Sequence, residues 1–276
     1  MNAGNTVLGA IIGDIIGSVH EGIGTKTKDF PLFVSQSNFT DDSVLTVAVA
    51  DWLLTGQDLS GLLHDYYRAY PGRGYGGMFR EWAERKRRTP YNSFGNGSAM
   101  RVSPVGFAFE TIDDVLLWAE RSSAVTHNHP EGIRGAQAAG AAIYYARRIK
   151  DRDQIKELLE SQFGYNLSTS LDQIRPAYCF DGTCQGTVPQ AIIAFLESTS
   201  YEDAIRNAIS LGGDADTLAC IAGGIAEAYY GDIPQDIAVD AKQLLDPKLT
   251  AVIHRFRGRF GLATINPTVF DISPLL

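Results

Sequence analysis

The chain has 276 residues, of which 45% are hydrophobic and 20% are charged, and its formal net charge is -8 at pH 7. This length suits one large domain or two small ones, and the composition is typical of a folded globular protein with a sizeable core. It excludes a disordered or membrane-embedded chain. The negative charge argues against binding to nucleic acid or to an anionic membrane through bulk charge.

Cysteines are few, and Cys179, Cys184 and Cys220 show no paired C-x-x-C spacing. This pattern argues against a disulfide framework and a structural zinc site, and a reducing cytoplasm is the expected compartment. The first apolar segment, Val7–Ile16, has no basic leader and contains Asp14. We therefore expect a buried first helix here rather than a signal peptide.

The segment Phe39–Val44, FTDDSV, places a hydroxyl and two carboxylates directly before an apolar run. Thr40 and Asp41 are suited to capping a helix, because their oxygens can accept from the free N–H groups of its first turn. Alternatively, Thr40, Asp41 and Asp42 could together hold a hard cation. Both interpretations stay open at this segment.

Helical periodicity dominates the chain and is clearest over 59–70, where apolar residues recur at the three-and-four spacing of one helix face. The same spacing predicts helices over 113–122, 153–163, 188–198 and 236–245. Residues 44–54 and 133–146 are apolar nearly all round, which indicates helices surrounded by other helices. Strand-like alternation is confined to the short segments 105–109 and 263–270. With no internal repeat or linker, the sequence predicts an all-α fold, a compact single-domain orthogonal bundle of many helices over 1–276.

Glycine-rich breaks separate the predicted helices at 70–79, 93–104, 126–132 and 211–217. Glycine lets backbone N–H groups approach a ligand closely, so we expect function to lie in these loops. In one of them His127 and His129 form a His-x-His pair, but no zinc-type helix or cysteine pair accompanies it, which argues against zinc.

The last of these breaks repeats the arrangement of the acidic segment at 39–44. Asp214, Asp216 and Thr217 stand at the start of an Ala/Gly-rich helix. Neighbouring residues on a helix diverge by about 100°, so one segment cannot surround an ion, but two segments that meet can. Clustered carboxylates without a cation would repel one another, and some of them would be protonated. Carboxylate and hydroxyl oxygens are ligands that suit magnesium better than zinc. Two independent helix caps remain the alternative.

Several motifs, taken together, carry a resemblance to a known family: GAIIGDIIGSVHEG at 9–22, TDDS at 40–43, YGG at 75–77, GNGSAMR at 95–101, TH at 126–127 and GGDADT at 212–217. In order and spacing the chain resembles the ADP-ribosylglycohydrolase family between Gly9 and Gly231. This family includes the dinitrogenase-reductase-activating glycohydrolases and the ADP-ribosyl-arginine and ADP-ribosyl-serine hydrolases. The resemblance implies an all-α fold with two Mg²⁺ ions in a cleft, for which Mn²⁺ is a possible substitute, and a substrate that carries ADP-ribose.

The resemblance also implies roles for individual residues. The implied metal ligands are Thr40, Asp41, Asp42, Asp214, Asp216 and Thr217. Glu21 matches a glutamate that acts in some relatives as general acid/base or in substrate positioning, and Asp41 is the rival base. The implied substrate-binding residues are Gly76 and Gly77 near the distal ribose, Asn96, Gly97 and Ser98 as a diphosphate and ribose cradle, Phe94 against adenine, and His127 toward the diphosphate or ribose. Phe94 is equally compatible with a place in the core, and Arg101 with either a phosphate contact or an internal ion pair.

These implications predict a magnesium-dependent hydrolase that cleaves the bond between C1″ of the distal ribose and an acceptor side chain, with arginine as the first choice. The expected partner is an ADP-ribosylated protein or a small ADP-ribose conjugate. Serine and other acceptors stay open. The alternatives are a protein that binds ADP-ribose without hydrolysing it, and a phosphoesterase or pyrophosphatase that uses the same two-metal centre.

Overall fold

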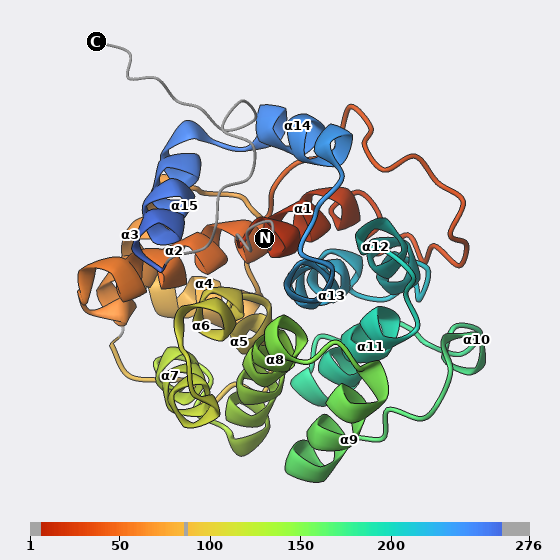
Figure 1. The fold of residues 1–276 in the computed structure, drawn as a ribbon. Helices are drawn as coiled ribbons and strands as arrows, with labels where there is room; N and C mark the ends of the chain where they lie inside the picture. Colours follow the sequence, from red (N-terminus) through yellow and green to blue (C-terminus); the bar gives the residue numbers. More distant parts are fainter. Residues whose placement is uncertain (1–6, 86–87, 261–276) are drawn as a thin grey trace.

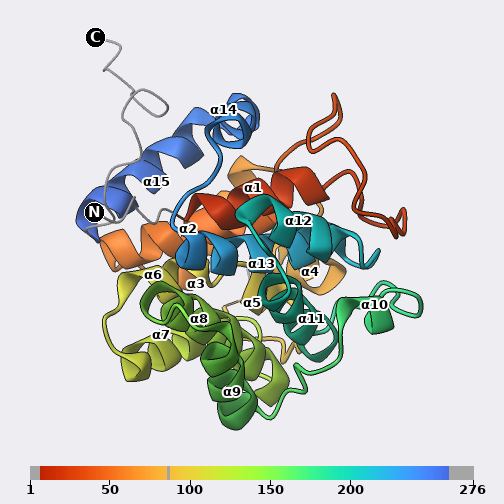
Figure 2. The same ribbon diagram turned by 45° about the vertical axis from the view of Figure 1, so that its right-hand side comes forward.

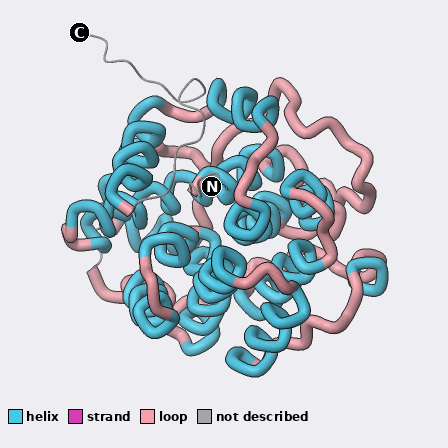
Figure 3. The backbone as a smooth tube through the Cα atoms, in the orientation of Figure 1, coloured by secondary structure: helices cyan, strands magenta, loops and turns pink. Residues whose placement is uncertain are grey.

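The computed structural model describes residues 7–85 and 88–260, and over these residues it is built from helices and loops (Figures 1 and 3). The helices are α1 (Leu8–Gly17), α2 (Asp41–Thr55), α3 (Leu59–Ala69), α4 (Gly77–Glu84), α5 (Gly97–Met100), α6 (Ser103–Ala108), α7 (Ile112–Ala124), α8 (Pro130–Arg148), α9 (Arg152–Phe163), α10 (Leu171–Ile174), α11 (Cys184–Leu196), α12 (Tyr201–Ile209), α13 (Ala215–Tyr230), α14 (Gln235–Leu244) and α15 (Pro247–Arg259). Within the described ranges no strand forms, and an isolated bridge pairs Gly95 with Thr183. The predicted all-α fold is confirmed.

Helix α13 lies in the middle of the bundle, where it contacts α1, α8, α11 and α12 (Figures 1 and 2). Every residue of α1 is buried, as are residues 215–228 of α13. The expectation of a buried first helix at Val7–Ile16 is therefore confirmed. None of the helices over 7–85 and 88–260 is both long enough and apolar enough to cross a membrane.

Helices α1 and α13 pack at backbone contact. A Cβ atom added to Gly9 would lie 2.4 Å from the carbonyl oxygen of Gly223, and one added to Gly13 would lie 2.1 Å from that of Ala219. The glycines are four residues apart in α1 and their partners four apart in α13, so each pair lies on one helix face. No larger side chain fits between these two helices without moving them.

This contact brings the end of α1 to the beginning of α13. A Cβ atom on Gly17 would lie 2.5 Å from Cα of Asp216, in the first turn of α13. Asp14, one turn earlier in α1, is 0% exposed. The packing of two apolar helices thus carries a buried carboxylate to the place where α13 starts.

Segment 105–109, predicted as a possible strand, lies largely in helix α6, so that prediction is wrong. Pro104 occupies the first turn of α6, where its fixed backbone angle favours a helix start. Gly106 packs against α8, and a Cβ atom there would lie 2.8 Å from the carbonyl oxygen of Gly140. All of residues 103–107 are buried, so the alternation does not reflect one exposed face. The other candidate, 263–270, lies outside the described residues.

The longer predictions agree with the structure. The predicted helices at 59–70, 113–122, 153–163, 188–198 and 236–245 correspond to α3, α7, α9, α11 and α14. Their ends differ by a few residues, most at α11, which starts four residues earlier than predicted and has Pro189 inside it. Side-chain periodicity locates a helix face, whereas caps and tertiary contacts decide where the helix ends.

Gly13→Ala is expected to lower the free energy of unfolding by about 3 kcal/mol, because its new methyl group must enter space held by backbone of α13. Urea unfolding followed by circular dichroism measures this. The matched control is Gly258→Ala in α15, where an added Cβ meets nothing within 4 Å. That variant should be stabilised by about 0.5 kcal/mol. Equal losses in both variants would contradict the role of the α1–α13 contact.

Candidate active site

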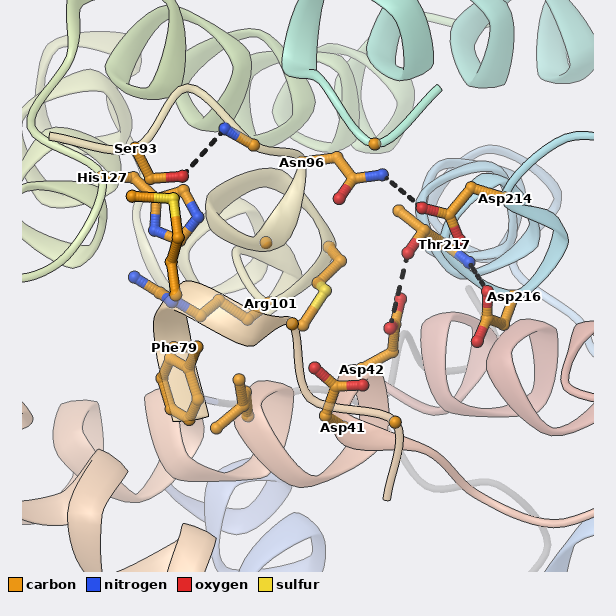
Figure 4. Close-up of a pocket in the computed structure, with 18 of the residues that line it drawn as sticks. Asp41, Asp42, Phe79, Ser93, Asn96, Arg101, His127, Asp214, Asp216 and Thr217 are labelled. Atoms are coloured by element: carbon orange, nitrogen blue, oxygen red, sulfur yellow. Dashed lines mark hydrogen bonds between the residues drawn. The ribbon is translucent and has the colours of Figure 1, made fainter. Parts of the chain in front are cut away.

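Five acidic side chains converge where α1 ends and where α2 and α13 begin, and Figure 4 shows three of them, Asp42, Asp214 and Asp216. One group contains Asp14, Asp42 and Asp216, and a second contains Glu21, Asp214 and Asp216; within each group the ligand atoms lie within 4.8 Å of one another. Asp216 belongs to both groups. The arrangement therefore offers two adjoining places for a cation, joined by one shared carboxylate.

The start of α2 is tied to Asp14. Thr40 is the N-cap of α2, and its hydroxyl accepts from the N–H of Asp42 at 3.2 Å. The same hydroxyl donates to Oδ1 of Asp14 at 2.6 Å, while the N–H of Ser43 donates to Oδ2 of Asp14 at 3.0 Å. The segment at 39–44 thus caps a helix, as one interpretation of its sequence predicted, and brings Asp42 into the acidic cluster; the cation site stays a prediction.

The start of α13 supplies the facing side of the cluster. Asp214 is the N-cap of α13 and accepts from Nδ2 of Asn96 at 2.8 Å. The N–H of Thr217 donates to Oδ1 of Asp216 at 2.9 Å, and its hydroxyl lies 3.5 Å from Oδ2 of Asp42. Two helix starts far apart in the sequence therefore meet in space.

Electrostatic repulsion in the cluster is large. Burial raises the pKa of Asp42 well above its ordinary value, and the charges of Asp14 and Asp41 raise it further. The pKa of Asp216 is likewise raised well above its ordinary value by burial and by the charges of Asp42 and Asp214. Oδ1 of Asp42 is buried without a hydrogen-bond partner. An unpaired buried carboxylate oxygen among like charges fits a divalent cation, which would satisfy the oxygen and neutralise the cluster.

Glu21 and Asp41, the two candidate acids, occupy different positions. Glu21 is exposed at the cavity, and its pKa is raised by partial burial and then by the charges of Asp214 and Asp14. Asp41 also lines the cavity, and burial followed by the charge of Asp14 raises its pKa well above its ordinary value. Asp41 belongs to neither three-carboxylate group, whereas Glu21 belongs to the second.

A cavity of about 390 Å³ extends from the acidic cluster. Of the residues expected to bind substrate, Gly76, Gly77, Asn96, Gly97 and His127 line it. The lining formed by the described residues does not include Phe94 or Ser98. The hydroxyl of Ser98 donates instead to the carbonyl oxygen of Gly132 at 2.8 Å. Phe94 is 45% exposed and its ring lies 5.3 Å from that of His129, so it does not lie in the core.

Sequence reasoning missed several residues of the site. In the sequence, Asp14 was taken only as a charge that argued against a signal peptide. Its place in the site could have been predicted from the fact that a carboxylate inside an otherwise apolar helix needs a buried partner. Phe180, 57% exposed, lines the cavity from the loop before α11. This loop is joined to the glycine loop, because the N–H of Asn96 donates to the carbonyl oxygen of Gly182 at 2.8 Å. No local pattern indicates that pairing.

Lys26 holds three loops of the site together. Its ammonium donates to the carbonyl oxygen of Arg175 at 2.8 Å and to those of Tyr178 and Leu211. These partners lie just before Phe180 and just before Asp214, while Lys26 itself follows Glu21 in the α1–α2 loop. The exposed ammonium of Lys26 thus joins the loops that carry Glu21, Phe180 and Asp214.

Comparisons with known proteins agree with this geometry. A family model described as ADP-ribosylglycohydrolase matches residues 2–263. The ADP-ribosylhydrolase ARH3 of Xenopus tropicalis is 27% identical over 82% of this chain and 86% of its own length. The ADP-ribosylarginine hydrolase Tri1 of Pseudomonas putida (strain GB-1) is 26% identical over 83% of this chain and 70% of its own length. A solved structure described as an ADP-ribosylglycohydrolase-related protein complex is similar with a TM-score of 0.69 and 25% identity, over 91% of this chain and 94% of that chain.

Asp216→Asn is expected to raise the free energy of unfolding in EDTA by on the order of 1 kcal/mol, because it removes a like charge from the cluster. The same variant should lose most of the stabilisation that a divalent cation gives the wild type. Urea unfolding with EDTA and with excess Mg²⁺ measures both effects. The control is Asp240→Asn on the exposed face of α14, which should change neither. An undiminished Mg²⁺ effect in Asp216→Asn would exclude binding at this cluster.

Proposed function

Because this chain belongs to the ADP-ribosylglycohydrolase family and is a glycosidic hydrolase, we propose that it uses Mg²⁺ to release ADP-ribose from an acceptor side chain. The bond cleaved would join C1″ of the distal ribose to the acceptor. One observation carries the proposal: Glu21, an acid whose pKa is raised, lies at a cavity that reaches a cluster of carboxylates with a shared member.

The proposed magnesium ligands come from the two helix starts and from the cavity wall. The residues proposed to hold the ions are Thr40, Asp41, Asp42, Asp214, Asp216 and Thr217. Their oxygens are the hard ligands that Mg²⁺ prefers, and Mn²⁺ should replace it. Two ions are favoured because Asp42 and Asp214 belong to different carboxylate groups, which share Asp216. Bound magnesium would supply Lewis-acid polarisation and orientation of ribose oxygens.

Glu21 is proposed to move the proton. Its raised pKa allows the carboxyl group to hold a proton nearer to neutral pH than an ordinary glutamate does. It would give this proton to the leaving acceptor atom as the bond between that atom and C1″ breaks. A water would then supply hydroxide to C1″, and the proton that this water releases would restore Glu21. Its exposure at the cavity, in contrast to the buried carboxylates, leaves it free to meet the acceptor. Asp41 is the second choice for this role.

The remainder of the cavity is proposed to hold ADP-ribose. Gly76 and Gly77 have nothing within 4 Å of where a Cβ atom would stand, so a ribose can approach their backbone. Asn96 lines the cavity between Asp214 and His127 (Figure 4), and Gly97 lines it beside the ring of His127. This order along the wall suits a ligand whose distal ribose meets the carboxylates and whose diphosphate lies toward His127.

Arginine is the acceptor that the charge of the site favours. Glu21 and Asp41 line the cavity, and a guanidinium can donate to the carboxyl oxygens of both, while the oxygen of an ADP-ribosylated serine has no hydrogen to donate. A relative from Pseudomonas putida is named an ADP-ribosylarginine hydrolase, which supports the same choice. Serine-linked substrates are the principal alternative.

Incubation with arginine-linked and serine-linked ADP-ribosylated peptides tests the proposal. The arginine-linked peptide should release intact ADP-ribose with Mg²⁺ and at least 100-fold more slowly with EDTA, as measured by chromatography of the products. Release of AMP or phosphate instead would identify a phosphoesterase. Binding of ADP-ribose with no release from either peptide would identify a protein that binds the ligand without hydrolysing it.

Matched variants separate proton transfer from metal binding in the same assay. Glu21→Gln should lower turnover about 100-fold or more while keeping the Mg²⁺-dependent stabilisation. Glu157→Gln, on the exposed face of α9, should keep both. Loss of the Mg²⁺ effect in Glu21→Gln would instead make Glu21 a metal ligand and leave Asp41 as the acid.

Adenine is proposed to stack at the outer end of the cavity, where the loops of Phe94 and Phe180 pair. Phe180→Ala should weaken ADP-ribose binding about tenfold by calorimetry, because Phe180 lines the cavity and stacking on an aromatic ring is lost. Phe94→Ala should cost less, because that ring leans on His129. Ribose 5-phosphate, which has no base, is the control ligand and should bind both variants equally. A larger loss in Phe94→Ala would assign the stacking to Phe94.

A further inference from the structure

Arg101 is a fully buried cation at the end of the cavity opposite the carboxylates (Figure 4). It follows helix α5, and its Nη2 donates to the carbonyl oxygen of Ser122 and to the hydroxyl of Thr126, both at 2.8 Å. Its Nε and Nη1 are buried without a hydrogen-bond partner. One of the two hydrogen bonds of this guanidinium is therefore with Thr126, which directly precedes His127.

The hydroxyl of Thr126 links Arg101 to His127. Its oxygen lies 2.8 Å from Nδ1 of His127. A guanidinium can only donate, so one lone pair of the Thr126 oxygen is taken by Arg101. The hydroxyl hydrogen of Thr126 can then go to Nδ1, which makes Nδ1 an acceptor; in the opposite assignment an N–H at Nδ1 donates to the second lone pair of Thr126.

The opposite assignment is electrostatically worse. It would place an N–H at Nδ1, on the side of the ring nearest the Arg101 charge, and turn the lone pair of Nε2 toward the acidic cavity. Burial, and after it the charge of Arg101, lowers the pKa of His127 well below its ordinary value. The ring is therefore neutral at pH 7, and with Nδ1 as acceptor its one proton lies on Nε2.

Nε2 has room for a ligand. A Cβ atom on Gly97 would lie 3.1 Å from Nε2, and one on Gly95 would lie 3.6 Å from it. These glycines keep side-chain atoms away from the ring nitrogen. The backbone of His127 is fixed by two hydrogen bonds with Ser123. The N–H of His127 donates to the carbonyl oxygen of Ser123 at 2.7 Å, and the Ser123 hydroxyl donates to the carbonyl oxygen of His127 at 2.8 Å.

We propose that Arg101 and Thr126 are positioning residues that fix His127 in the Nε2–H tautomer, so that it donates a hydrogen bond to a ligand oxygen in the cavity. A neutral donor in this place binds a phosphate or hydroxyl oxygen with a strength that does not change between pH 6 and 8, because no proton is gained or lost. The tautomer assignment is independent of the proposed function. The identification of the ligand oxygen as one of ADP-ribose rests on the proposed function.

Long-range ¹H–¹⁵N spectra of the full chain at pH 7 test the tautomer directly. The His127 signals, assigned by their loss in His127→Gln, should show an unprotonated Nδ1 and a protonated Nε2. A protonated Nδ1, or two protonated nitrogens, would overturn the proposal. The tautomer itself is measured on the wild type, and the variant serves only to assign the signals.

Thr126→Val, with Thr126→Ser as its control, tests the link to Arg101. The valine removes the hydroxyl at nearly constant size, so the Nδ1 signal should move toward that of a nitrogen without a hydrogen bond, and ADP-ribose should bind about threefold to tenfold more weakly. Serine should restore both. An Nδ1 signal and an affinity that are both unchanged in Thr126→Val would overturn the positioning role. The expected spectra with no ADP-ribose binding in any form would instead overturn the ligand assignment and keep the tautomer.

Discussion

The backbone contact between α1 and α13 is the constraint on which the site depends. Glycines at positions 9 and 13 let the two helices approach more closely than side chains permit. The approach sets where Asp14 lies, and Asp14 in turn accepts hydrogen bonds from Thr40 and Ser43 at the start of α2. The positions of α1, α2 and α13 are thereby linked through the buried carboxylate of Asp14. The loops that connect these helices are positioned by the same contacts.

The fold stabilises a cluster that opposes folding. Buried carboxylates close together cost stability, because each loses water and repels the others. Two features reduce this cost: the N–H groups at the starts of α2 and α13 face the acids, and hydroxyls of Thr40 and Thr217 lie among them. A bound cation would remove the rest. The large apolar core around α13 offsets the unfavourable free energy of this carboxylate cluster, so the fold can keep the cluster in place.

The sequence predicted those parts of the site whose signals are local. TDD and GGDADT combine helix-capping residues with acids, and both the helix and the cluster need these residue types at that spot. Asp14 was missed because its partners are 26 and 29 residues away and its role depends on helix packing. Phe180 was missed because a loop pairing that no periodicity encodes brings it to the cavity. Segment 105–109 was misread because a short buried helix and a short strand share the same apolar composition.

The two ends of the cavity carry opposite electrostatic character, and this polarity constrains how any ligand lies in it. Figure 4 shows Asp214, Asp216 and Thr217 at one end and His127 with Arg101 at the other. The buried Arg101 has no carboxylate partner among its hydrogen bonds, so its field reaches into the cavity rather than being cancelled locally. Without a bound cation, a phosphate group is repelled by the carboxylates and attracted to the His127 end, while a cationic acceptor is attracted to the carboxylate end. A ligand with an anionic middle and a guanidinium at one terminus is therefore oriented by the field before any specific hydrogen bond forms.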